Sequence, residues 1–234
     1  MKNYYKGRDD GLGNRVEEIL KLEEYCDKTG ETCEYYWNNN TPNKNRRYVN
    51  RLKCKNVKIT LESPTSEHTI INNQISKCIK FPQKLKHIIE YERPLRTNLS
   101  YVAIHVRSTD KLLNRGPDEF TKEVLEKNLE YLIKYIATSD HKNLAITSDN
   151  EVICHHIMQL LKGFNFVSPF KDYISDPIYR DYFTLVYATE VYMCPKFSSY
   201  ATTASILGGN KLNCFQNTGE TVLSRYNANV RFID

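Results

Sequence analysis

The sequence has no run of apolar residues long enough to cross a membrane, which takes roughly 18–20 of them. Its first residues, MKNYYKGRDDGLGNR, carry charges where a signal peptide would have its apolar segment, so secretion is not expected. Internal repeats and low-complexity tracts are also missing. These absences argue against membrane-spanning and repeat classes, make secretion unexpected, and predict a soluble protein.

No Cys-x-x-Cys pair occurs among the seven cysteines, which are scattered along the chain. Zinc ribbons and dithiol redox sites use such pairs, so neither is expected, and the thiols are predicted to be reduced and either buried or idle. The adjacent residues Cys154, His155 and His156 fall on an expected helix and point in different directions. We therefore expect no metal site and no resident cofactor.

Positive charge is only mildly in excess, with a formal net charge of +5 at pH 7. That value suits an anionic ligand but does not by itself indicate nucleic acid. The 234 residues, with 40% hydrophobic and 26% charged, predict one large or two small globular domains. A basic run at residues 44–58 could bind RNA or an acidic partner, although a solvated loop is the simpler interpretation.

Helices and strands alternate along the chain. Apolar spacing predicts helices at residues 16–25, 81–91, 124–136, 152–161, 176–190 and 201–207, and Lys28-Thr29-Gly30 is expected to close the first of them. Apolar or aromatic runs predict strands at residues 34–37, 57–61, 101–106, 143–147, 164–167 and 191–197. This order predicts doubly wound α/β sheets of parallel strands. A polar stretch around Pro94 predicts a boundary between residues 1–97 and residues 98–234.

The segment HVRSTDK at residues 105–111 is the most informative in the chain. It follows an expected buried strand, and doubly wound sheets bind ligands at the carboxyl ends of their strands. An arginine there can hold a phosphate with two parallel hydrogen bonds, so Arg107 is a candidate anion contact. Asp110 could hold that arginine or accept a hydrogen bond from a sugar or base, and a purely structural pair is the alternative.

Three other segments have a similar double interpretation. GLGNR at residues 11–15 precedes a helix, and its glycines would let backbone amides approach a phosphate. It lacks the third glycine of the dinucleotide fingerprint and the lysine of a P-loop, so it could be an ordinary turn. Ser198 with Ser199, and Ser148 with Asp149, precede helices and could be caps, anion contacts or both.

Taken together, these segments resemble the fucosyltransferase superfamily of α1,6-fucosyltransferases, nodulation fucosyltransferases and protein O-fucosyltransferases. HVRSTDK resembles its first peptide motif, ITSD at residues 146–149 its second, and FSS at residues 197–199 its third, in the family's order. GLGNR resembles its glycine loop. The resemblance implies a GT-B-like fold with two Rossmann-like halves and an inverting, metal-independent glycosyltransferase. The implied reaction moves a sugar from a nucleotide sugar, GDP-fucose first, to a glycan or glycoconjugate acceptor.

The resemblance also implies roles for individual residues. Arg107 would hold the donor β-phosphate and stabilise the leaving diphosphate, a charge that an arginine, amides and helix ends can neutralise without a metal. Asp110 and Asp149 would contact the nucleoside. The other implied donor contacts are Gly11, Gly13, Asn14, Arg15, His105, Ser198 and Ser199.

The catalytic base stays open. The α1,6 enzymes have a glutamate shortly after the first motif, where this sequence has Arg115, with Asp118 and Glu119 a few residues further on. In some O-fucosyltransferases the acid belongs to the glycine loop, which here indicates Asp9 or Asp10. An inverting transfer needs one carboxylate near the acceptor hydroxyl. Asp10 and Asp118 are the candidates.

Other functions remain compatible with these residues. A relative could have changed from GDP-fucose to another donor such as UDP-xylose without losing any of them. A phosphatase or nucleotide hydrolase using His105 and Arg107 is a second alternative, and an RNA- or acidic-partner-binding module using residues 44–58 is a third. The glycine loop begins so early that no anchor is expected before it. We therefore expect a cytoplasmic enzyme of a microbe or large virus, with no nucleic-acid partner.

Overall fold

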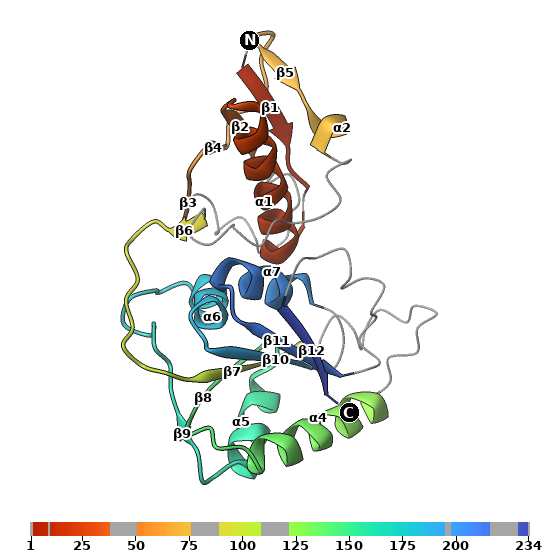
Figure 1. Cartoon of the computed structure of the whole chain (residues 1–234), viewed down its shortest axis with the longest axis vertical. Helices are drawn as coiled ribbons and strands as arrows, with labels where there is room; N and C mark the ends of the chain where they lie inside the picture. Colours follow the sequence, from red (N-terminus) through yellow and green to blue (C-terminus); the bar gives the residue numbers. More distant parts are fainter. Residues whose placement is uncertain are drawn as a thin grey trace. The chain divides into compact units, whose positions relative to one another are not determined.

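A computed structural model describes residues 2–8, 10–37, 51–75, 89–108, 122–194, 198–215 and 229–233. The chain divides into two compact units, Met1–Arg96 and Thr97–Ser224, and the C-terminal residues Ala228–Asp234 join the second unit (Figure 1). In the described ranges, no helix combines the length and the apolar character needed to span a bilayer.

The N-terminal unit is built on a four-stranded parallel sheet with the order β4-β2-β1-β5. Its strands are β1 (Lys2–Lys6), β2 (Cys33–Tyr36), β4 (Val57–Thr60) and β5 (His68–Ile70). The long helix α1 (Leu12–Thr29) connects β1 to β2 and packs against β2 and β4, and the short α2 (Asn72–Ile75) follows β5. A separate antiparallel pair joins β3 (Leu52–Cys54) to β6 (Ile89–Tyr91).

Helix α1 ends as its sequence predicts. Its inner face buries Val16, Ile19 and Leu20. Gly30 then takes the left-handed conformation, with φ of 70°, and its N–H donates to the Cys26 carbonyl. A glycine adopts this conformation without the steric cost that a side chain would add, so the helix stops here.

The C-terminal unit is a six-stranded parallel sheet with the order β12-β11-β10-β7-β8-β9. Its strands are β7 (Val102–Val106), β8 (Asn143–Ser148), β9 (Asn165–Phe166), β10 (Glu190–Cys194), β11 (Lys211–Phe215) and β12 (Asn229–Ile233). Helices α4 (Lys122–Ala137) and α5 (Glu151–Leu160) cover one face, and α6 (Pro177–Val186) and α7 (Ser199–Gly208) cover the other (Figure 1). The doubly wound α/β architecture predicted for this part of the chain is confirmed.

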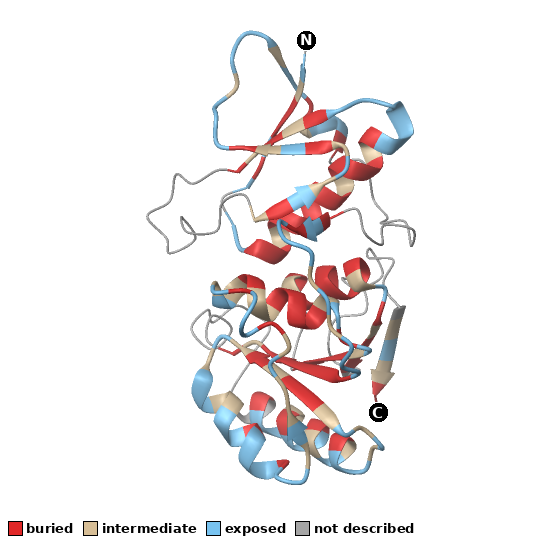
Figure 2. Ribbon diagram, turned by 90° about the vertical axis from the view of Figure 1, so that its left-hand side faces the viewer, coloured by how far each residue is buried: buried red, intermediate tan, exposed pale blue. Residues whose placement is uncertain are grey.

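Strand β7 lies at the centre of this sheet and is buried along its whole length (Figure 2). Val102, Ile104 and Val106 pack into the apolar cluster formed with α4 and α5. Because side chains alternate along a strand, Ala103 and His105 face the opposite layer of α6 and α7. The strand therefore presents one polar side chain, His105, inside the second helical layer.

The structure corrects three expectations about local elements. Residues 89–91, expected at the end of a helix, form strand β6, because they pair with β3; the rest of that expected helix lies outside the described residues. Helix α6 ends at Val186, before Glu190 begins β10. The cap of α5 is Asn150, whose side chain accepts from the Val152 N–H at 3.0 Å, and not Ser148 or Asp149.

Two glycines near the end of β1 differ in how crowded they are, which gives a matched pair of substitutions. A Cβ on Gly7 would lie 2.4 Å from the Tyr35 hydroxyl oxygen and 2.6 Å from the Tyr36 carbonyl oxygen, whereas a Cβ on Gly11 would have no atom within 4 Å. We expect Gly7→Ser to lower the free energy of unfolding by about 1–3 kcal/mol, because overpacking forces neighbours to move. Gly11→Ser, at a helix N-cap that favours serine, is expected to stay within about 0.5 kcal/mol of wild type. Urea denaturation checks both, and equal losses would contradict the crowding at Gly7.

Candidate active site

The strand order places a topological switch point in the C-terminal unit. From the central strand β7 the chain proceeds to β8 and β9 on one side, and then returns to build β10, β11 and β12 on the other. Ligands of doubly wound sheets bind in the crevice outside the carboxyl ends of the strands at such a point. The motif residues that follow β7 and β10 are therefore brought to one edge, as the sequence predicts.

Arg107 lies directly beyond the carboxyl end of β7. Its backbone N–H donates to the Cys194 carbonyl of β10 at 3.1 Å, so the hydrogen-bond ladder continues one residue past the strand. The side chain is half-buried at this edge. The backbone of the arginine is thus fixed by the sheet, while its side chain retains access to solvent.

His105 is buried and joins three segments. Its Nδ1 lies 3.0 Å from the Thr147 hydroxyl of β8, and its Nε2 lies 3.2 Å from the Ser198 hydroxyl at the start of α7. The ring stacks on Tyr200, with centroids 5.3 Å apart. Burial, helped by the positive charge of Arg107, lowers the pKa of His105 to about 4, so the imidazole is neutral at pH 7.

These contacts decide what His105 can do. The side chain is 6% exposed and both ring nitrogens already have protein partners. A phosphatase or hydrolase would need this ring at the surface as a nucleophile or acid, and the structure does not provide that. His105 connects β7 to β8 and to the start of α7, and direct contact with a donor stays a prediction.

Asp149 binds the loop that follows β7. Its Oδ1 accepts hydrogen bonds from the N–H and the hydroxyl of Ser108, at 2.9 and 3.2 Å. Ser108 is fully buried. This carboxylate therefore ties the segment after Arg107 to the end of β8. Two other predicted site residues, Asp110 and Asp118, lie outside the described residues.

Ser198 and Ser199 begin α7, as the sequence predicts, but their side chains are buried. The Ser198 hydroxyl is bonded to His105 and makes no cap hydrogen bond to the helix. The hydroxyls of Thr202 and Thr203 donate back to the carbonyls of Ser198 and Ser199, at 2.9 and 2.6 Å. The first turn of α7 thus begins without a side-chain cap on its amide groups.

Asp181 was not predicted from the sequence. This residue lies in the second turn of α6, whose N-cap Asp176 accepts from the Ile178 N–H at 2.9 Å. The Tyr200 hydroxyl donates to the Ile178 carbonyl, so the starts of α6 and α7 lie together. Burial raises the pKa of Asp181 to about 6, against the opposing influence of Arg180. The sequence signal that could have indicated Asp181 is the predicted helix at residues 176–190, because it starts at the carboxyl edge of the sheet.

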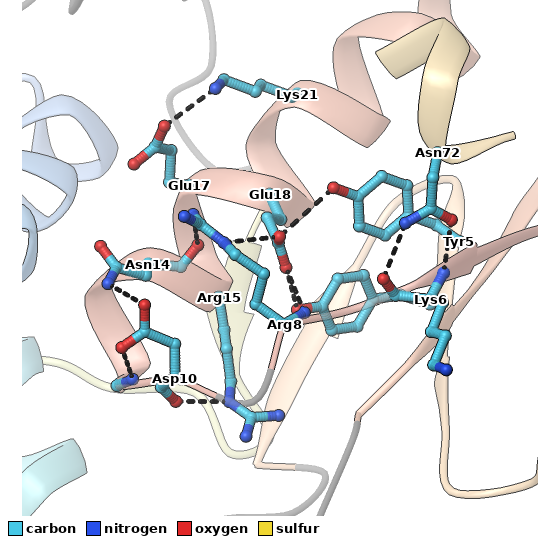
Figure 3. Close-up of polar contacts among 12 residues, drawn as sticks. Tyr5, Lys6, Arg8, Asp10, Asn14, Arg15, Glu17, Glu18, Lys21 and Asn72 are labelled. Atoms are coloured by element: carbon cyan, nitrogen blue, oxygen red, sulfur yellow. Dashed lines mark hydrogen bonds and ion pairs between the residues drawn. The ribbon is translucent and has the colours of Figure 1, made fainter. Parts of the chain in front are cut away.

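In the N-terminal unit, the loop after β1 is organised by Glu18 (Figure 3). This buried carboxylate accepts from the Tyr35 hydroxyl at 2.7 Å, the Tyr5 hydroxyl at 3.3 Å, and the backbone N–H and side-chain Nε of Arg8 at 3.0 and 2.7 Å. Arg8 remains half-exposed beyond these contacts. Glu18 therefore fixes the guanidinium group at the carboxyl end of β1.

The predicted glycine-loop residues gather at the start of α1 (Figure 3). Asp10 accepts from the Gly11 N–H at 2.7 Å through Oδ1, and from the Asn14 side-chain amide through Oδ2. Arg15 donates from Nε to the Asp10 carbonyl at 2.7 Å and places its guanidinium 4.6 Å from the centre of the Trp37 ring. Arg15 is 1% exposed, so its observed contacts are internal, whereas Gly11 has open space beside it. Gly13 is buried in the first turn.

The basic run is largely paired where the structure describes it. Arg51 forms an ion pair with Glu92, Lys55 with Asp27 at 2.9 Å, and Lys58 with Glu34 at 3.3 Å. Cations already paired with carboxylates are less available to a polyanion, which weakens the RNA-binding alternative. In the described part of the chain, no three His, Cys, Asp or Glu side chains are grouped so that they could hold a metal ion.

The buried imidazole predicts a pH-dependent difference between wild type and His105→Asn. The pKa of His105 falls from 6.5 to about 4 on folding, so acid protonates the unfolded chain first and the stabilising contribution is lost between these pH values. The stability gap between wild type and variant should shrink by about 3 kcal/mol from pH 7 to pH 4. Asp181, whose pKa is raised to about 6, acts in the opposite direction but is present in both proteins. A gap that is constant with pH, measured by urea denaturation, would contradict a neutral buried His105.

No protein-family model matches the chain, and no curated protein matches its sequence. Among solved structures it is similar to NodZ α-1,6-fucosyltransferase co-crystallised with GDP, with 12% identity and a TM-score of 0.55 over 94% of this chain and 97% of that one. It is also similar to NodZ soaked with GDP-fucose (12% identity, TM-score 0.50, 88% and 93% covered) and to NodZ from Bradyrhizobium (12%, 0.52, 88% and 94%). The fold implied by the sequence resemblance is therefore confirmed: the chain has a fucosyltransferase-like GT-B fold.

Proposed function

We propose that the chain is a glycosyltransferase that moves a sugar from a nucleotide sugar, with GDP-fucose as the leading donor, to a glycan or glycoconjugate acceptor. The observation that carries this proposal is the position of Arg107 at the switch point between β7 and β10. The fold supports it, because the NodZ structures of the same fold were obtained with GDP and with GDP-fucose.

The proposed reaction is an inverting transfer, in which negative charge develops on the departing diphosphate. The Arg107 guanidinium can hold two phosphate oxygens at once, and the first-turn amides of α7 favour negative charge at the same edge. The backbone that carries Arg107 is fixed by its bond to Cys194, and the start of α7 is fixed by the Ser198–His105 contact. Fixed donors aimed at developing charge are an effective form of transition-state stabilisation, and this proposal needs no metal.

The predicted donor-site residues then divide into two groups. Arg107 and the amide groups at Ser199 are proposed as contacts with the diphosphate. His105, Asp149 and Ser198 are proposed as positioning residues, because their polar atoms bond to other protein groups. We add Asp181, whose partly buried carboxyl group at this edge could accept a hydrogen bond from the nucleoside.

A nucleotide panel tests this function first. We expect the unfolding temperature to rise with GDP, but not with UDP, CDP, ADP or single-stranded RNA, and the rise to persist in EDTA. A ligand at a hundred times its dissociation constant adds about 2.7 kcal/mol, which is readily measured. A shift with UDP alone would retain the glycosyltransferase and replace its donor with one such as UDP-xylose. A shift with RNA alone would contradict the proposal in favour of the basic segment.

The same assay locates the contact. Arg107→Ala and Arg107→Lys should each abolish the GDP shift, because lysine keeps the charge and loses the planar fork. Donor hydrolysis, followed as GDP release from GDP-fucose, should fall by about 10²–10³-fold. Arg51→Ala serves as the matched control. Arg51 lies in the N-terminal unit, where it pairs with Glu92, so its loss should change neither readout.

Asp10 and Asp118 stay the proposed candidates for the base. Asparagine at position 10 would retain an oxygen for the Gly11 N–H, so Asp10→Asn should keep the loop while removing the basic group. We expect one of Asp10→Asn and Asp118→Asn to lower kcat by about 10²-fold or more with the GDP affinity unchanged. Transfer to an acceptor preparation measures kcat, and the thermal shift measures GDP affinity. Full activity in both variants would exclude both carboxylates.

A further inference from the structure

Two cysteines that are separate in the sequence lie in contact in the N-terminal unit. Cys26, near the end of α1, and Cys33, at the start of β2, have their sulfur atoms 3.1 Å apart. Both are buried, and the cysteines that the structure describes are free thiols. A disulfide bond is about 2.05 Å long, so closing this pair takes a movement of about 1 Å. No dithiol site was predicted from the sequence, because these two cysteines do not have the Cys-x-x-Cys spacing.

One of the two sulfur-bearing residues lines a cavity. A surface cavity of about 520 Å³ lies at the amino ends of β1, β2 and β4, and Cys33 belongs to its lining whereas Cys26 does not. Among the described residues, the lining includes four lysines and one carboxylate, Glu34. The lysines are Lys2, Lys53, Lys55 and Lys58. Lys55 and Lys58 form ion pairs with Asp27 and Glu34, so Lys2 and Lys53 supply the excess of positive charge that favours an anionic molecule in the space next to Cys33.

We propose that this cavity is a thiol–disulfide exchange site for a small anionic disulfide of the glutathione type. The Cys33 thiolate attacks one sulfur of the incoming disulfide, which forms a mixed disulfide and releases one small thiolate. Cys26 then attacks the Cys33 sulfur, giving up its proton to the second departing thiolate. The Cys26–Cys33 disulfide is the product. The incoming disulfide is the oxidant and is reduced to two thiols.

The order of attack follows from the geometry. Cys33 is the member of the pair that belongs to the cavity lining, so we infer that it meets the incoming disulfide first, and Cys26 contacts its sulfur from helix α1. The Cys26 S–H donates to the Cys33 sulfur, which lowers the pKa of the Cys33 thiol and raises that of Cys26. The thiolate is the reactive form, so this hydrogen bond favours Cys33 as the first nucleophile. Cys54 also lines the cavity, but burial raises the pKa of its thiol.

The test treats the purified full-length protein with oxidised glutathione and follows intact mass and peptide maps. Wild type should lose two hydrogens in mass as the Cys26 and Cys33 peptides become linked. Cys26→Ser should stop at the intermediate and gain one glutathione on Cys33, and Cys33→Ser should form neither product. Cys54→Ser is the matched control and should react as wild type does. The reaction does not involve a nucleotide, so its outcome is independent of the proposed glycosyltransferase activity.

A second comparison tests the cavity itself. Lys53→Gln should slow the reaction with oxidised glutathione severalfold and leave the reaction with the neutral 2-hydroxyethyl disulfide unchanged. Linked Cys26 and Cys33 peptides from wild type alone support the exchange even if a serine variant fails to fold. Modification confined to other cysteines, or a wild-type mass unchanged under conditions that oxidise a small reference dithiol, would overturn the proposal. Equal slowing of both probes would overturn the role of the lysines.

Discussion

The C-terminal unit depends on a buried imidazole that must stay uncharged. His105 lies between the hydroxyls of Thr147 and Ser198, and a neutral ring donates through one nitrogen and accepts through the other. Its partners come from β8 and from the start of α7, 42 and 93 residues later in the chain. Loss of the ring would leave buried hydroxyls without a partner, which costs about 1–3 kcal/mol for each group. One side chain thereby fixes the relative positions of three segments at the carboxyl edge of the sheet.

In the N-terminal unit, the buried group that connects separate segments is a carboxylate. The carboxylate of Glu18 is buried, and a buried charge is tolerated when it is paired and hydrogen-bonded. Four donor groups supplied by Tyr5, Tyr35 and Arg8 satisfy it, and they connect α1 to β1 and β2. This arrangement also explains the need for a glycine at position 7, where a side chain would collide with Tyr35. In both units, a buried polar group holds a loop that follows a central strand.

The sequence predicted those parts of the structure that local pattern controls. The continuous apolar run of β7 and the stop of α1 at Gly30 were predicted correctly, because each depends on a few neighbouring residues. Strand β1 was missed because KNYYK buries only Tyr4 and Tyr5, and β11 contains a buried Asn213 that is explained by its bond to Glu190. Long-range partners controlled the remaining errors.

The start of α5 shows how such a partner overrides local pattern. Ser148, Asp149 and Asn150 all have the chemistry of a helix cap, and the sequence favoured the first two. Asp149 instead accepts a hydrogen bond from Ser108, which is distant in the sequence, and Asn150 caps the helix. The pleat of β7 has a comparable effect: His105 and Arg107 lie on the same side, but His105 is covered by α7 whereas Arg107 extends past the sheet edge. A strand can thus supply a rigid internal tie and, two residues later, a half-buried side chain beyond the sheet edge. Under the proposed function, this tie would reduce the entropy lost when a nucleotide binds.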